Sequence, residues 1–177
     1  VDGTNLFHQF DDFNVSADQT VTFVTPDTVA NILGRISGGQ SSLIDGSLSV
    51  SNDASLWLLN PAGILFGPNA QLNLQGDFSA ATANAIGFEQ DWFDGANSQL
   101  LAGPPTRLAF TSNPGYLINL GNLQVASGQN LRLLGGNVMN AGTLSAPDGT
   151  ITLVAVTDNS RQVNPTHTDP LLTLAIE

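Results

Sequence analysis

Apolar residues recur along the chain in short alternating pairs, and the pairs repeat about every twenty residues. In the last third, Asn119, Gly121, Leu123 and Gly128 are matched 21 positions later by Asn140, Gly142, Leu144 and Gly149. A one-residue deletion then aligns Leu131 and Leu133 with Ile151 and Leu153. Residues at i and i+2 lie on the same side of a strand, so each strand has one apolar face. Repeats of this length built from short strands predict a solenoid.

A single coil of such a chain cannot bury its apolar face. Stacked coils can, because each strand then pairs with the strands about 4.8 Å above and below it. We expect Leu to stack on Leu inside the column and Asn on Asn at the corners, each side-chain amide bonding the next. The predicted fold class is all-β: a right-handed parallel β-helix with an N-terminal cap and one extra-helical excursion.

One domain is expected over residues 1–177, because the chain is too short for two comfortable cores. The Phe-rich segment 1–25 is unlike the repeat and predicts a cap over an open end. Residues 40–82 and 106–156 are expected to form the coil rungs. Residues 83–105 break the rhythm and predict an excursion, such as a hairpin on the flank. The other end has no comparable cap, so we expect the coil to continue as part of a larger protein.

Two segments depart from the strand pattern. Helical spacing occurs only from Thr28 to Ile36, where Val29, Ile32, Leu33 and Ile36 fall on one stripe. This stripe predicts a short helix or an irregular turn that ends at Gly38 and Gly39. The tail after Val156 is irregular until Leu171–Ile176, which could form one more strand.

The charge of the chain is strongly acidic. The chain contains fifteen Asp and Glu residues but only four Arg and no Lys, which gives a formal net charge of −11. Binding to phosphates needs clustered cations, so we expect neither nucleic acid nor an anionic membrane surface as a partner. The acids are mostly Asp in turns, where the carboxylate bonds its own backbone. No Cys and no apolar run near eighteen residues occur, which excludes disulfides and a membrane-spanning helix. We expect a monomer.

Catalytic and metal-binding residues are not indicated, and no cofactor is expected. His8 and His167 lie far apart without neighbouring ligands, and His8 is interpreted as part of the cap. Some parallel β-helices degrade polysaccharides, and fold alone does not decide function. However, glycosidase chemistry needs paired carboxylates, whereas the recurrent residues here are Asn and Gly. Another alternative is a glycan-binding adhesin, with Trp57, Trp92 and Phe93 stacking on sugars and Trp57 facing outward.

One short motif has a definite local geometry. Pro61 fixes φ near −65° and keeps Asn60 out of the helical region. Asn first, Pro second and Gly63 fourth suit a type I turn. Apolar residues on both sides, Leu56–Leu59 and Ile64–Phe66, predict a tight corner between two strands.

Four stretches together resemble the two-partner secretion domain at the N-terminus of filamentous haemagglutinin and related exoproteins. They are Gly3–Val15, Asn31–Leu48, Asn60–Ala70 and Ser79–Ile86. Within them, Asn60, Pro61, Ala62, Gly63 and Ile64 are similar to the family signature Asn-Pro-Asn-Gly-Ile. A secondary motif consists of Asn31, Gly38, Gly39 and Gly46. The residue pattern of Ile64–Asn69 is similar to that of cyanobacterial members of the family.

The resemblance implies a secretion-targeting domain that passes through the periplasm of a Gram-negative-type cell and ends secreted or on the cell surface. Its implied partner is an outer-membrane barrel transporter, whose POTRA domains bind the unfolded chain transiently before the domain folds outside and nucleates a longer β-helix. Residues 60–64 are then either a folding element alone or also a transporter-recognition motif. The sequence departs from the family at Ala62, where the signature has Asn. A second family motif, Asn-Pro-Asn-Leu, is replaced by Thr25–Thr28.

Overall fold

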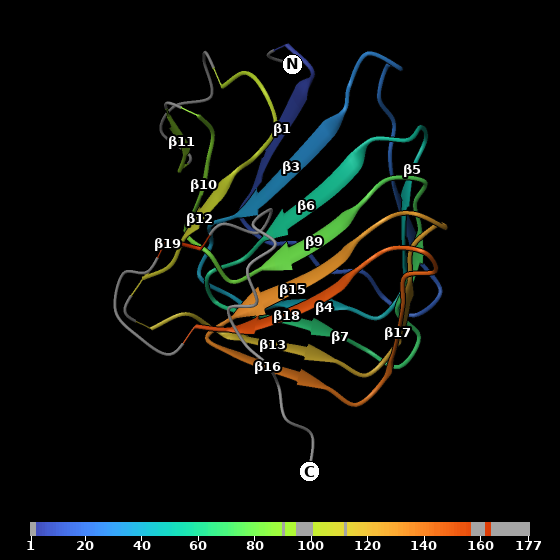
Figure 1. Cartoon of the computed structure of the whole chain (residues 1–177). Helices are drawn as coiled ribbons and strands as arrows, with labels where there is room; N and C mark the ends of the chain where they lie inside the picture. Colours follow the sequence, from blue (N-terminus) through green and yellow to red (C-terminus); the bar gives the residue numbers. More distant parts are fainter. Residues whose placement is uncertain (1–2, 90, 95–100, 112, 157–161, 164–177) are drawn as a thin grey trace.

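The computed structural model describes residues 3–89, 91–94, 101–111, 113–156 and 162–163, and all regular structure among them is β-strand. No helix of the length and apolarity needed to span a membrane is found in these residues. Three parallel sheets wrap around a common core, and a fourth, antiparallel sheet lies on one flank (Figure 1). The predicted parallel β-solenoid with an excursion is therefore confirmed.

The three parallel sheets, here called A, B and C, are built from strands of successive coils. Sheet A is built, in order, from β1 (Asn5–Phe10), β3 (Asn31–Ile36), β6 (Ser55–Leu59), β9 (Phe78–Ala81), β15 (Leu131–Gly135) and β18 (Ile151–Ala155). Sheet B contains β4 (Ser42–Ile44), β7 (Ile64–Phe66), β13 (Tyr116–Asn119) and β16 (Asn137–Asn140). Sheet C contains β2 (Thr20–Phe23), β5 (Ser47–Val50), β8 (Gln71–Asn73), β14 (Asn122–Gln124) and β17 (Thr143–Ser145).

The strand register follows the spacing of the repeat. Leu123 pairs with Leu144 in sheet C, and Leu131 pairs with Ile151 in sheet A. Side chains on the inner faces of the three sheets form one buried cluster that runs through the coils. Burial of apolar area, worth roughly 25 cal/mol per Å², is the main force that stacks the coils.

Polar ladders occur at two corners of the coil, as the repeat predicts. Asn119 donates from Nδ2 to Oδ1 of Asn140 at 2.8 Å. Asn31 donates in the same way to Asn5 at 2.9 Å. Each bond joins neighbouring coils, so the amides fix the register that the Leu columns favour.

The corner between sheets B and C requires small residues. Gly46, Ala70, Gly121 and Gly142 each precede a strand of sheet C. A Cβ on Gly121 would lie 2.6 Å from the carbonyl oxygen of Gly67 and 2.8 Å from Cβ of Ala70. Neighbouring coils therefore approach so closely here that glycine recurs for lack of space.

The helix or turn predicted at Thr28–Ile36 is wrong, because residues 31–36 form strand β3. The strand pairs in parallel with β1 on one side and β6 on the other. Ile32 and Ile36 point into the solenoid core, whereas Leu33 points to the flank cluster. A strand that is buried on both faces carries apolar residues without strict alternation. The resulting spacing of apolar residues in β3 resembled that of a helix and led to the wrong prediction.

The excursion forms an antiparallel sheet D from β10 (Ala85–Gly87), β11 (Trp92–Phe93), β12 (Arg107–Ala109) and β19 (Gln162–Val163). Together with the outer face of sheet A it encloses a second apolar cluster, separate from the solenoid core. Trp57 points away from the core as predicted, yet it is only 4% exposed because this cluster covers it.

The described strands extend beyond the ranges expected for the rungs. β1 and β2, within the expected cap, pair with β3 and β5 as the first coil. β3 precedes residue 40, and β12 belongs to sheet D although it follows residue 105. The strand suggested at 171–176 lies outside the described residues.

Candidate functional site

The Asn60 turn closes as its sequence predicts. The N–H of Gly63 donates to the carbonyl of Asn60 at 3.0 Å, the bond of a four-residue turn. The Asn60 side chain is 1% exposed and fully engaged. Its Nδ2 donates at 2.9 Å to the carbonyl of Gln40 and to Oγ of Ser42, and its Oδ1 accepts from the N–H of Ala62 at 3.0 Å. One amide therefore holds two consecutive coils together.

The rest of the motif is fixed by its neighbours on both sides. Gly63 has a φ of 128°, which favours glycine, and its carbonyl accepts from the N–H of Ser42 at 3.0 Å. The carbonyl of Pro61 accepts from Gly115 at 2.9 Å. Ile64 is buried in the core, Pro61 is half-buried and Ala62 is exposed. Ala62 is thus the one fully exposed side chain of residues 60–64.

The secondary motif is spread over three places. Gly38 and Gly39 precede Gln40, so their turn lies beside Asn60. A Cβ on Gly38 would clash with the carbonyl oxygen of Asp11. Asn31 begins strand β3 and bonds Asn5, and Gly46 occupies the corner between sheets B and C. The structure therefore brings together Gly38, Gly39 and the Asn60 turn, but not Asn31 or Gly46.

Aromatic side chains gather at the N-terminal end of the solenoid core. The ring of Phe13 lies 5.1 Å from that of Phe10 and 6.3 Å from that of Phe23, measured between centroids. His8 joins them, 5.8 Å from Phe10 and 5.6 Å from Phe23. Burial in this cluster lowers the pKa of His8 and favours its neutral form. These contacts agree with the interpretation of His8 as part of the cap.

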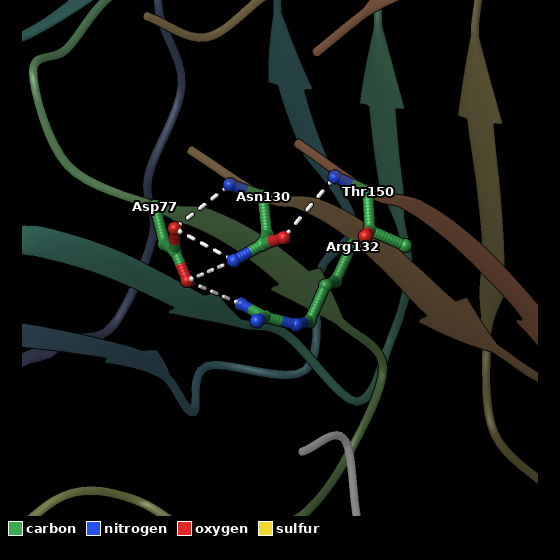
Figure 2. Close-up of polar contacts among 4 residues, drawn as sticks. All are labelled: Asp77, Asn130, Arg132 and Thr150. Carbon is green, nitrogen blue, oxygen red and sulfur yellow. Dashed lines mark hydrogen bonds and ion pairs between the residues drawn. The ribbon is translucent and has the colours of Figure 1, made fainter. Parts of the chain in front are cut away.

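A polar cluster that the sequence did not reveal joins β9 to β15 (Figure 2). Asp77 Oδ1 accepts from the backbone N–H of Asn130 at 2.8 Å, and its Oδ2 accepts from Arg132 Nη1 at 2.8 Å. Asn130 extends the hydrogen-bond network to the next coil, because its Oδ1 accepts from the N–H of Thr150 at 3.1 Å. The residues that Asp77 binds lie beyond the excursion, 53 or more positions away, so spacing within the repeat gave no signal.

Polar bonds also fasten the excursion to the coil. The amide of Asn5 is buried and donates to the carbonyls of Leu101 at 2.7 Å and Gly103 at 2.8 Å. The guanidinium of Arg35 donates from Nε to the carbonyl of Asn84 at 2.9 Å. The excursion is therefore tied to the first two strands of sheet A.

The aromatic residues considered for sugar binding are largely covered. Trp57 and Phe93 are buried in the flank cluster. Trp92 is half-buried, and the guanidinium of Arg107 lies 4.8 Å from its ring centroid. No group of three or more His, Cys, Asp or Glu placed to hold a metal occurs in the described part of the chain, and His167 lies outside it.

Fold and motif together define a small parallel β-solenoid domain with a flanking sheet and an Asn-Pro turn built into one corner. The model of the TPS secretion domain family matches residues 1–176, so the chain belongs to this family. TPS secretion domains are secretion-targeting modules of exported proteins, and the family is not one of enzymes.

The crystal structure of the HMW1 secretion domain from Haemophilus influenzae has the same fold. The TM-score is 0.69, with 24% sequence identity over 94% of this chain and 44% of that chain. This chain thus spans less than half of the length of that one. No curated protein matches the chain.

Proposed function

We propose that the chain directs export by presenting residues 60–64, while unfolded in the periplasm, to the POTRA domains of a cognate outer-membrane barrel transporter. The observation that carries the proposal is the burial of the Asn60 side chain in the folded domain. All the hydrogen-bonding atoms of the Asn60 side chain bond to the protein itself. A partner can therefore bind this amide only before the turn closes.

The composition of the chain suits passage in an unfolded state. It has no Cys, so no cross-link restricts threading through a pore. The described residues contain one salt bridge, Arg132–Asp77, and its acceptor lies 55 residues before its donor. Parallel strands pair residues far apart in sequence, which makes folding slow relative to local structures. A slowly folding chain leaves time for the transporter to bind it.

The last described coil offers a surface on which further coils can form. β16, β17 and β18 stand last in their sheets, each with one neighbour among the described strands. Leu144 and Leu153 pack against the core but are only partly buried, and Ile151 is 43% exposed. We propose that this edge nucleates the β-helix of the protein in which the domain resides.

Two substitutions in the motif separate recognition from folding. Asn60→Ala removes three hydrogen bonds at a buried position and is expected to lower the free energy of unfolding by about 2–4 kcal/mol. Ala62→Asp alters an exposed side chain and is expected to change it by less than about 0.5 kcal/mol. Binding to isolated POTRA domains is measured with chain freshly diluted from urea and with refolded domain. The urea-diluted chain is expected to bind and the refolded domain is not, and Ala62→Asp is expected to weaken both this binding and export.

Equal binding of folded and unfolded chain would contradict recognition before folding. Normal export of Ala62→Asp, with Asn60→Ala losing export only in proportion to its stability, would reduce residues 60–64 to a folding element.

The nucleating edge has its own matched pair of variants. Ile151 points toward the core column of Leu131, whereas Met139 lies on the outer face of the same coil and is 47% exposed. Ile151→Glu in the full exoprotein is expected to slow acquisition of protease resistance beyond residue 156, and Met139→Glu is not. Equal rates for both variants would show that the edge does not nucleate folding.

A further inference from the structure

The outer face of sheet C consists of uncharged polar side chains in register. Two columns cross the strands, Thr20–Ser47–Gln71–Asn122–Thr143 and, beside it, Thr22–Ser49–Asn73 continued by Gln124–Ser145. The residue between the two columns in each strand is Val or Leu and points inward. None of the five strands contains a charged residue, although the chain carries a net charge of −11.

Sheet C opens into a groove between β8 and β14. These strands are bridged only at Gln71 and Asn122. The turn that follows β14, residues 125–130, is longer than the turn that follows β8, residues 74–77, so the two coils diverge. The resulting open groove has a volume of about 350 Å³.

Carboxamides dominate the walls of this groove. Gln71, Asn73 and Gln75 project outward from one side and Asn122 and Gln124 from the other, and all five are exposed. Leu72, Leu74, Val125 and Ala126 complete the lining. A carboxamide both donates and accepts, which matches a hydroxyl group.

We propose that the outer face of sheet C binds a neutral polysaccharide, with the groove between β8 and β14 as one of its subsites. Paired strands about 4.8 Å apart present the first column as a regular row of hydrogen-bonding groups, close to the repeat of one sugar unit along an extended glycan. The groove volume falls at the lower end of the range of small-molecule sites, about 300–1,000 Å³, and accommodates a short stretch of the chain.

The charge of the face selects the class of ligand. Acidic glycans are repelled by the net negative charge of the protein and find no cation on these strands. Protein partners bury an apolar centre in a stable interface, whereas none of the exposed large apolar side chains of the described residues belongs to a strand of sheet C. An uncharged polyhydroxyl chain fits both conditions.

Affinity electrophoresis tests the proposal on the folded domain, in gels that contain hydroxyethyl cellulose, dextran, soluble starch or, as an acidic comparison, alginate. At least one neutral polymer is expected to retard the protein, and alginate is not. Gln71→Ala with Gln124→Ala is expected to weaken binding about tenfold, as the loss of two or three hydrogen bonds implies. Asn137→Ala, which removes an exposed amide from sheet B, serves as the matched control and is expected to bind normally.

Thermal unfolding of each variant shows whether the fold is intact. Asn122→Asp provides a second test. A single negative charge in the groove is expected to weaken the binding of a neutral glycan only moderately, and alginate is expected to remain unbound. No retardation by any neutral polymer, preferential retardation by alginate, or binding that survives Gln71→Ala with Gln124→Ala would each overturn the proposal. The export assay is expected to be unaffected by these variants, so the two functions fail independently.

Discussion

Removal of the Asp77 carboxylate tests how much this side chain adds to the strand pairing that joins the coils across the excursion. Asp77→Ala takes away the acceptor for the backbone N–H of Asn130 and for the guanidinium of Arg132. The two side chains of the ion pair are 21% and 12% exposed, so solvent replaces these bonds only in part. Hydrogen bonds to a charged group contribute about 1.5–3 kcal/mol, and an orphaned buried donor costs about 1–3 kcal/mol. We expect Asp77→Ala to lower the free energy of unfolding by about 2–4 kcal/mol.

A double-mutant cycle with Arg132→Leu isolates the ion pair from the other bonds. Arg132→Leu removes the positive charge of the pair. When Asp77→Ala is added to Arg132→Leu, only the N–H donors of Asn130 lose their acceptor. The coupling energy between the two positions is expected to be about 1–2 kcal/mol. Asp77→Asn, which keeps an acceptor for Asn130, is expected to cost less than Asp77→Ala.

Urea unfolding followed by tryptophan fluorescence measures these values, because Trp57 is buried between sheet A and the flank. Asp18→Ala is the control, since Asp18 is exposed, and it is expected to change stability by less than about 0.5 kcal/mol. If Asp77→Ala were as mild as Asp18→Ala, or if the coupling energy were zero, the stabilising role assigned to the Asp77 carboxylate would be refuted.

Three further predictions concern the corners and the cap. Gly121→Ala forces a Cβ to within 2.6 Å of the Gly67 carbonyl oxygen and is expected to cost about 1–3 kcal/mol in urea unfolding. Asn119→Ala leaves the N–H of Gly121 without its acceptor and is expected to cost about 2 kcal/mol, whereas Asn140→Ala, at an exposed end of the same ladder, is expected to cost less than half as much; equal costs would contradict the ladder. Because burial lowers the pKa of His8, the unfolded chain takes up the proton first, so stability is expected to fall as pH drops below about 6.5. His8→Phe is expected to lose this part of the pH dependence, as acid titrations of the unfolding midpoint would show.

The sequence predicts the coil because the coil is periodic. The alignment of Leu123 with Leu144 became a pair of neighbouring residues in sheet C, and Asn119 bonds Asn140 as expected. The turn at Asn60 also follows from its residues, since Pro and Gly restrict the backbone locally. Local conformation and a repeat spacing are both properties that a sequence displays directly.

The features that the sequence did not reveal depend on segments far apart in the chain. Leu33 looked helical because sheet D covers the outer face of β3, and nothing in residues 28–36 indicates that cover. The partners of Asp77 follow an excursion of irregular length, so no repeat aligns them. The amide groove of sheet C likewise arises from the unequal turns after β8 and β14, which become adjacent only in the folded coil.

The order in which these contacts can form connects the fold to export. The side chain of Asn60 bonds backward, to residues 40 and 42, and so completes its turn as soon as the first coils meet. Asp77 bonds forward, to residues 130 and 132, and remains unsatisfied until the chain beyond the excursion arrives. The hydrogen bonds of the Asp77 carboxylate can therefore form only after those of the Asn60 side chain. Under the proposed function, a transporter bound to residues 60–64 blocks the early step, whereas the late step waits for residues 130–132.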